Sequence, residues 1–129
     1  ASHLTRLMNE TGVVPAVNQI ELHPTFQQRD LVAFHRDHGI ATEAWSPLAK
    51  GALGEPAIIA IALKHKRSPA QVTLRWHQQY GNITIPKSAT PARIKENIAI
   101  FDFALDEDDM EVFAKLDRGN RLGAHPDFR

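Results

Sequence analysis

Segment 87–93 combines two cations with two hydroxyl groups at a position where a helix is expected to begin. Lys87 and Ser88 follow a short apolar run, and Thr90 and Arg93 flank a proline of the kind that opens helices. The free backbone N–H groups and the dipole of a helix N-terminus attract anions, and basic side chains and hydroxyl donors add to that attraction. The segment is therefore a candidate phosphate site. Helix capping by Thr90, with solvated cations beside it, accounts for the same spacing and stays open as an alternative.

The elements that must position this segment alternate between strands and helices. Short apolar runs bounded by proline, glycine or polar residues predict strands at 16–22, 40–45 and 82–86. Helical spacing of apolar residues predicts helices at 2–10, 25–38, 57–66 and 68–80, from 90 and from 106. Strands separated by helices indicate a parallel sheet, with its strands adjacent in chain order and joined by right-handed crossovers.

Helix starts are marked by residues with the spacing of capping boxes. Thr25 and Gln28 have this spacing, and so do Ser68 and Gln71, while Asp106 is placed to cap the last helix. The side-chain oxygen of such a residue accepts a hydrogen bond from a free N–H group of the first turn. We therefore expect helices to begin at these three places.

Three parallel strands are too few for a finished fold, because both edges of the sheet stay unpaired. Polar residues such as Gln19, Glu21 and Glu43 also lie within the predicted strands. Alternate residues of a barrel strand face the barrel interior, where polar groups near the mouth can be functional. The fold class expected is thus α/β, a C-terminal portion of a (β/α)8 TIM barrel. Glu21 and Glu43 are interpreted as interior residues paired with cations or water.

Composition narrows the function classes. The chain has 129 residues, which we interpret as a single partial domain over 1–129, with zero formal net charge and no cysteine. Neutral charge argues against nucleic-acid and membrane partners, and the absence of cysteine excludes disulfides and thiolate chemistry. No signal peptide or long apolar run is evident, so a cytoplasmic protein is expected. The first residue is Ala1 rather than methionine, which suggests processing or truncation.

Histidines provide no predicted metal site. His35 and His38 share a helix face at a spacing that can bind a metal ion. We interpret them instead as favourable positive charges in the last turn of a helix. No metal is therefore expected.

Three blocks of sequence, in the same order and spacing, resemble the aldo-keto reductase family. Segment 85–97, from Ile-Pro-Lys-Ser to Glu-Asn, resembles the last signature of that family. Residues 17–24 resemble its sixth barrel strand, and residues 45–48 resemble its seventh. The ending 123–127 is similar to that of the bacterial 2,5-diketo-D-gluconate reductase branch.

This resemblance implies that NADPH lies across the C-terminal mouth of the barrel. Gln19 would hydrogen-bond the nicotinamide carboxamide, and Trp45 would stack on the nicotinamide ring. Ser46 and Leu48 would contact the pyrophosphate bridge, with Lys50 nearby.

At the other end of the cofactor, Lys87, Ser88 and Arg93 would hold the 2′-phosphate of the adenosine ribose. Two cations suit this phosphate, whereas a cofactor without it is usually recognised by a carboxylate on the ribose. The remaining residues expected at this end are Thr90 at the helix start and, beside the adenine, Glu96 and Asn97.

The resemblance also implies what this chain lacks. The catalytic tyrosine, lysine, aspartate and histidine of the family lie on its first four strands, and this chain begins about where the fifth helix would. The only tyrosine, Tyr80, ends a predicted helix and is interpreted as a packing aromatic. We therefore expect no catalytic residue here, although the chain supplies cofactor-binding residues to an NADPH-dependent oxidoreductase.

Such an enzyme reduces aldehydes or ketones to alcohols, so a small carbonyl compound is the expected substrate. The other expected partner is the missing N-terminal half of the barrel, or a second copy that pairs with the open strand edges. Two alternatives from other classes were weighed. A non-catalytic nucleotide-binding or interaction fragment, inactive alone, remains open, whereas a helix-turn-helix DNA-binding protein is disfavoured because the chain lacks a basic surface.

Overall fold

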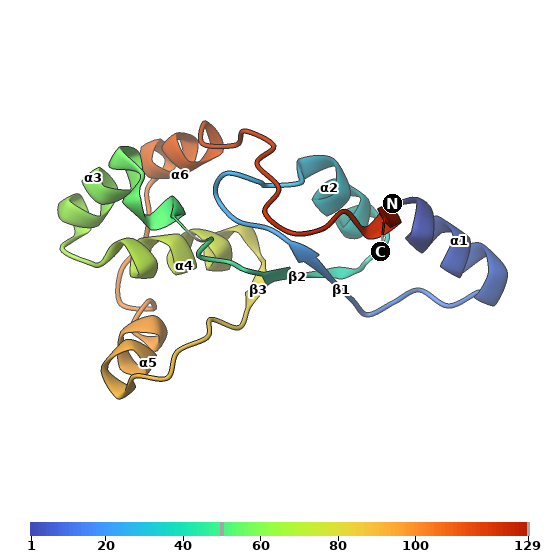
Figure 1. Ribbon diagram of the computed structural model, residues 1–129, viewed down its shortest axis with the longest axis horizontal. Coiled ribbons are helices and arrows are strands. Elements are labelled where there is room, and N and C mark those ends of the chain that lie inside the picture. Colours follow the sequence, from blue (N-terminus) through green and yellow to red (C-terminus); the bar gives the residue numbers. More distant parts are fainter. Residues whose placement is uncertain (50, 129) are drawn as a thin grey trace.

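Three parallel strands form the centre of the molecule. The computed structural model describes residues 1–49 and 51–128, and Figure 1 shows their arrangement. The sheet consists of β1 (Val17–Glu21), β2 (Ala41–Trp45) and β3 (Ile83–Thr84), in that order. Both pairs are parallel, so the predicted order and direction of the strands are confirmed, although β3 is shorter than the expected strand 82–86. The carboxyl ends of all three strands therefore meet at one edge of the sheet.

Helices surround this sheet at nearly the expected places. They are α1 (Ser2–Thr11), α2 (Arg29–Asp37), α3 (Pro56–His65), α4 (Pro69–Tyr80), α5 (Pro91–Ile98) and α6 (Glu107–Ala114). Of two short 3-10 turns, η1 (Ala52–Gly54) lies between β2 and α3, and η2 (Pro126–Phe128) lies near the C-terminal end. No helix of residues 1–49 and 51–128 is long and apolar enough to cross a membrane.

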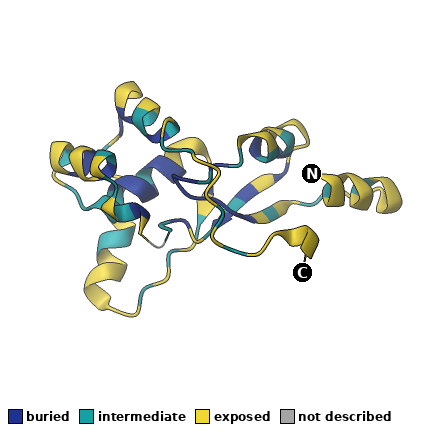
Figure 2. Ribbon diagram, turned by 45° about the horizontal axis from the view of Figure 1, so that its top comes forward, coloured by how far each residue is buried: buried dark blue, intermediate teal, exposed yellow. Residues whose placement is uncertain are grey.

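The core lies where α3, α4 and α6 meet the sheet. Trp76 of α4 and Phe113 of α6 are fully buried and stack with ring centroids 5.4 Å apart. Burying an aromatic or large aliphatic side chain contributes about 1.5–3 kcal/mol. Figure 2 shows that buried residues concentrate here, whereas α1 is almost wholly exposed.

Two predicted capping boxes begin helices as expected. The hydroxyl of Ser68 accepts a hydrogen bond from the backbone N–H of Gln71 at 3.1 Å, and the Gln71 side chain accepts one in return at 3.0 Å. Asp106 and Asp109 form the same reciprocal pair at 2.8 and 3.1 Å. A hydrogen bond from Lys64, aided by the Asp109 N–H, lowers the pKa of Asp106 to about 2.

The capping box predicted at Thr25 and Gln28 is wrong. Helix α2 begins one turn later than expected, with Gln28 as its N-cap in the left-handed region at φ 46° and without a side-chain cap. The Gln28 amide instead donates to the backbone carbonyl of Glu21. The hydroxyl of Thr25 is buried 3.2 Å from Nδ1 of His23. A tight turn at 23–26 thus uses the polar groups that the spacing assigned to a cap.

The interpretation of His35 as a favourable positive charge in the last turn of a helix is also wrong. His35 is fully buried, with its Nδ1 2.8 Å from the Thr42 hydroxyl and its Nε2 2.9 Å from the Asn18 amide nitrogen. That amide can only donate, so Nε2 accepts and the imidazole is neutral. Burial lowers the pKa of His35, which favours the neutral form. His35 therefore links α2 to both β1 and β2.

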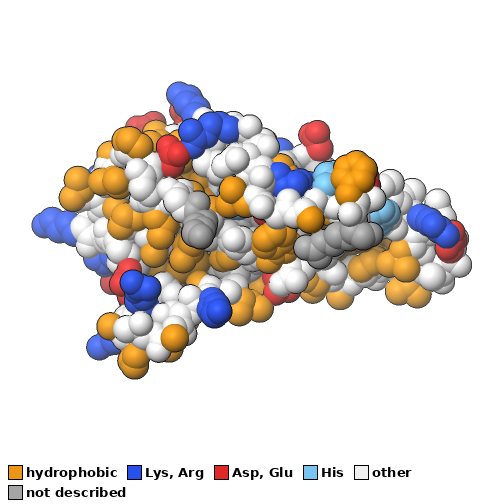
Figure 3. Space-filling model, viewed as in Figure 1, with side chains coloured by type: hydrophobic (Ala, Val, Ile, Leu, Met, Phe, Trp, Pro, Cys, Tyr) orange, Lys and Arg blue, Asp and Glu red, His pale blue; other side chains and the backbone are white. Residues whose placement is uncertain are grey.

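Helix α5 leaves its apolar residues uncovered. Ile94 and Ile98 are 54% and 67% exposed, and Phe101 just beyond the helix is 64% exposed. Ile85, in the segment that leads to α5, is 70% exposed. Figure 3 shows apolar and basic side chains together on this part of the surface. Exposed apolar groups on neighbouring segments are typical of a surface that another element covers.

Candidate functional site

The carboxyl ends of β1 and β2 bring Gln19 and Trp45 to the same face of the sheet. Gln19 pairs in register with Glu43, and Glu21 pairs with Trp45, so these four side chains point to one side. The Gln19 amide donates a hydrogen bond to Glu43 Oε1 at 3.3 Å. Gln19 is exposed and Trp45 is half-buried, which leaves both side chains accessible at the mouth.

A tight loop follows Trp45. Ser46 and Ala49 both adopt positive φ, 55° and 47°, and the Ala49 N–H donates to the Ser46 carbonyl at 3.0 Å. The carbonyl of Pro47 accepts a hydrogen bond from Nε2 of His77 at 2.8 Å. Ser46 is exposed and Leu48 is half-buried, so both residues predicted to contact the cofactor are accessible in this loop. Lys50, also predicted here, lies outside the described residues.

The residues predicted to bind a phosphate group lie at the start of α5 and just before it. Lys87 and Arg93 are exposed, and the ion pairs of the described residues include neither. The expectation that the Thr90 side chain caps α5 is wrong, because it makes no capping hydrogen bond. Ser88 instead approaches the backbone of Thr90 at 3.4 Å. Free first-turn N–H groups and two cations therefore lie on one short segment.

The end of α5 is tied to α4. The hydroxyl of Ser68 donates to the Glu96 carboxylate, and the Gln71 amide donates to the Glu96 backbone carbonyl at 3.2 Å. Asn97 is half-buried beside them. One oxygen of Glu96 is thus already occupied by Ser68, and a ligand would have to use the other.

A C-terminal strap, residues 118–123, crosses the mouth at the carboxyl ends of the strands. The Thr25 carbonyl accepts hydrogen bonds from the N–H groups of Arg118 and Asn120, at 3.1 and 3.0 Å. The guanidinium of Arg121 lies 4.6 Å from the centre of the Phe26 ring. Figure 1 shows this segment, in red, passing over the ends of the strands. The strap is therefore docked on the turn that follows β1.

Glu21 fixes the far end of the strap. Its buried carboxylate accepts hydrogen bonds from the N–H groups of Leu122 at 2.5 Å and Gly123 at 2.9 Å, and from His23 Nε2 at 3.1 Å. Burial acts to raise the pKa of Glu21, but these three hydrogen bonds outweigh it and hold the pKa below its ordinary value. Its partners are thus backbone amides and a histidine rather than the expected cations or water.

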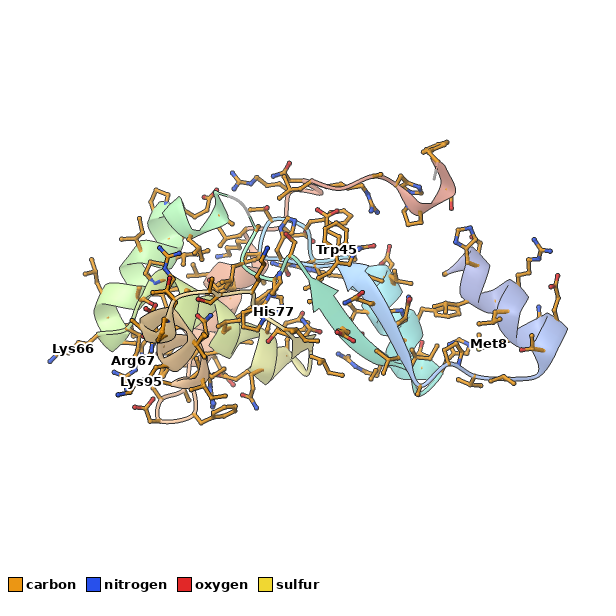
Figure 4. All side chains as sticks on the ribbon, turned by 60° about the horizontal axis from the view of Figure 1, so that its bottom comes forward. Met8, Trp45, Lys66, Arg67, His77 and Lys95 are labelled. Atoms are coloured by element: carbon orange, nitrogen blue, oxygen red, sulfur yellow. The ribbon has the colours of Figure 1, made fainter. Side chains whose placement is uncertain are left out.

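Gly123 packs directly against the ring of Trp45. A Cβ atom at this position would lie 2.3 Å from Trp45 Cη2 and 3.0 Å from Cζ2, which is closer than any real contact. Figure 4 shows Trp45 near the ends of the strand arrows. A cavity of about 310 Å³ opens beside Gln19 and Trp45. No local sequence signal predicts this contact, because Trp45 and Gly123 come from distant parts of the chain.

Residues 1–118 match the aldo/keto reductase family. The chain belongs to this family. It is 53% identical over 128 residues to methylglyoxal reductase DkgA of Salmonella typhimurium, covering 97% of this chain and 46% of that protein. An aldo-keto reductase of Mycolicibacterium smegmatis is 55% identical, with 96% and 46% covered. The crystal structure of a Gox0644 variant in complex with NADPH matches at a TM-score of 0.98 and 54% identity, covering all of this chain and 48% of that one.

As an aldo/keto reductase, the chain spans about half the length of the relatives it matches. Its three parallel strands and flanking helices are consistent with a C-terminal part of a (β/α)8 barrel. Within the described residues, no group of three or more potential ligands could hold a metal ion. Tyr80 ends α4 and packs against Trp76 with ring centroids 5.6 Å apart. The distinctive features of this part of the barrel are thus its mouth and the start of α5.

Proposed function

We propose that this chain is the NADPH-binding part of an oxidoreductase that reduces aldehydes or ketones to alcohols. The observation that carries the proposal is the start of α5, where Lys87 and Arg93 are exposed beside the free first-turn N–H groups of the helix. A dianionic 2′-phosphate fits such a set of donors. The NADPH bound to the similar Gox0644 variant supports the same cofactor.

The adenosine end of NADPH is assigned to the segment 87–97. Lys87, Ser88 and Arg93 bind the 2′-phosphate, and the backbone N–H groups after Thr90 add further donors. Asn97 and the carboxylate oxygen of Glu96 that Ser68 leaves free contact the adenine. Because the binding energy comes from charge at the 2′-phosphate, this end determines the preference for NADPH over NADH.

The nicotinamide end is assigned to the mouth. Trp45 offers a half-buried ring face for stacking, and the exposed amide of Gln19 offers both a donor and an acceptor to the carboxamide. Ser46 and Leu48 bind the pyrophosphate link between the two ends. When bound, NADPH supplies the hydride that reduces the carbonyl carbon. These residues hold and orient it.

The groups that protonate the substrate oxygen are proposed to lie outside this chain. Residues 1–129 would correspond to strands six to eight of the barrel and their helices, and the missing half would pair with the open edge of β1. The exposed Val17 of that edge and the uncovered Ile94 and Ile98 of α5 favour such a partner. Similarity to methylglyoxal reductases supports a small carbonyl substrate.

The proposal is tested by substitution of Arg93 in the full-length protein that contains this chain. A charge-assisted hydrogen bond contributes about 1.5–3 kcal/mol, so Arg93→Ala should weaken NADPH binding by roughly tenfold or more. NADH lacks the 2′-phosphate, and its dissociation constant should change by less than about twofold. Fluorescence titration with both cofactors measures the two values.

Lys95→Ala provides the matched control, since Lys95 is an exposed cation on the same helix, labelled in Figure 4. It should leave both dissociation constants near the wild-type values. Equal weakening of NADPH and NADH by Arg93→Ala would refute the assignment of the 2′-phosphate. A similar effect from Lys95→Ala would mean that only the general charge of α5 matters.

A further inference from the structure

The loop after β2 holds a conformation that it would not keep by itself. Ser46 and Ala49 are not glycine, yet both lie in the left-handed region, at φ 55° and 47°. Residues with a Cβ adopt this region at an energetic cost and persist in it only where surrounding contacts enforce it. A hydrogen bond from the Ala49 N–H to the Ser46 carbonyl closes the turn, but this bond does not attach the loop to the rest of the fold.

His77 of α4 supplies such an attachment from below. Its side chain is completely buried, and Nε2 donates to the carbonyl of Pro47 at 2.8 Å. The Trp76 ring packs edge-on against the imidazole, with centroids 4.6 Å apart. Figure 4 shows His77 in the interior, next to the sheet. Pro47 is itself buried, so its carbonyl depends on this partner.

The other nitrogen of the imidazole contacts the start of β3. The Asn82 side-chain amide nitrogen lies 3.2 Å from Nδ1 of His77, and the backbone N–H of Asn82 donates to the backbone carbonyl of His77 at 2.9 Å. Because the amide nitrogen only donates, Nδ1 accepts and the proton resides on Nε2. Burial lowers the pKa of His77 to about 4, so this neutral arrangement holds at physiological pH.

His77 therefore joins two segments that lead to different parts of the proposed site. Pro47 lies in the loop assigned to the pyrophosphate, and Asn82 precedes β3, which leads directly to Lys87. One imidazole ring fixes the position of the first segment against the second. A change of about 1 Å in such a position is enough to weaken binding of a ligand that spans both.

We infer that His77 is a positioning residue that sets loop 46–49 for the pyrophosphate of the cofactor. This inference rests on the proposed function, because it assumes that the loop binds NADPH. It adds a residue that does not touch the cofactor and lies on α4, away from the mouth. Loss of the Nε2 donor leaves the Pro47 carbonyl unpaired and lets the loop leave its left-handed conformation.

The test compares two ligands in the full-length protein. NADPH spans both segments, whereas adenosine 2′-monophosphate, which has no 5′-phosphate and so no part of the pyrophosphate, carries only the part assigned to 87–97. His77→Phe, which keeps an aromatic ring without the donor, should raise the dissociation constant for NADPH by about tenfold. It should change that for adenosine 2′-monophosphate by less than about twofold. His77→Gln retains a side-chain N–H donor and should restore most of the NADPH affinity.

His35→Phe is the matched control, since His35 is equally buried and hydrogen-bonded but contacts neither segment. It should lower stability without a selective loss of NADPH. Asn82→Ala gives a second variant if His77→Phe does not fold, because it removes the amide that orients the ring and should also weaken NADPH selectively.

Unchanged NADPH affinity in His77→Phe, or in Asn82→Ala where His77→Phe does not fold, would overturn the role of His77. So would an equal loss of both ligands, or the same pattern in His35→Phe. Failure of the wild-type protein to bind NADPH would instead refute the proposed function itself. The two failures are therefore distinguishable in one set of titrations.

Discussion

Substitution of Gly123 by alanine should disturb the mouth more than its size suggests. The new Cβ would lie 2.3 Å from Cη2 of Trp45, whereas ordinary carbon contacts are about 3.5–4 Å. Either the ring or the strap must move by more than about 1 Å. If the strap moves, Glu21 loses hydrogen bonds worth about 1.5–3 kcal/mol each; if the ring moves, overpacking costs about 1–3 kcal/mol. We expect the free energy of unfolding to fall by about 2 kcal/mol.

Urea denaturation of the full-length protein measures this loss, and tryptophan emission reports the movement of the ring. Gly54→Ala is the matched control, because a Cβ at Gly54 meets nothing within 4 Å and its φ is negative or extended. It should change stability by less than about 0.5 kcal/mol. In a Trp45→Ala background the clash is removed, so most of the penalty of Gly123→Ala should disappear.

Gly123→Ala with the stability and emission of Gly54→Ala would refute this reasoning. An undiminished penalty in the Trp45→Ala background would show that the glycine is required for its backbone and not for its contact with the ring.

Other predictions follow from the buried polar groups and from the incomplete sheet. Burial lowers the pKa of His77 from 6.5 to about 4, so between these pH values the unfolded chain binds a proton that the folded protein does not. The free energy of unfolding should therefore fall by about 3 kcal/mol as the pH drops from 6.5 to 4. His77→Gln should flatten this part of the stability profile, and identical profiles of the two proteins would contradict the prediction. Asp109→Ala removes the buried carboxylate that accepts from the Asp106 N–H in the capping box and that pairs with Lys64 and His65, and should cost about 2 kcal/mol by thermal unfolding, whereas exposed Asp108→Ala should change little. The 129-residue chain alone should not reduce aldehydes with NADPH, and activity should appear only after mixing with the missing half of the barrel; turnover by the chain alone would mean that its catalytic residues have been misplaced.

Local chemistry accounts for the parts of the fold that the sequence predicted. Ser68 with Gln71, and Asp106, begin their helices as expected, because the donor and acceptor of a capping box lie three residues apart. Strand order and direction followed from the alternation of strands and helices. The segment from Lys87 to Arg93 could be proposed as a phosphate site because all of its groups are neighbours in sequence, and that assignment stays a prediction.

Contacts between distant segments account for most of the errors. Thr25 has the spacing of a cap, but its hydroxyl points inward to His23. Its backbone carbonyl accepts hydrogen bonds from two N–H groups of the strap. His35 lies in the last turn of a helix, yet Asn18 and Thr42 of two strands enclose it. The partners of Glu21 were missed for the same reason. Apart from His23, which lies two residues from both Glu21 and Thr25, these partners cannot be identified from spacing, since each depends on the assembled fold.

The hydrogen bonds between Glu21 and the strap also bear on the order of folding. Leu122 and Gly123 follow Glu21 by 101 and 102 residues, so closing this loop costs about 4 kcal/mol of chain entropy. Contacts this distant in sequence form only after local helices and neighbouring strands have reduced the search. We therefore expect Trp45 to reach its final packing late in folding, so that its fluorescence lags behind the helical circular dichroism signal during refolding.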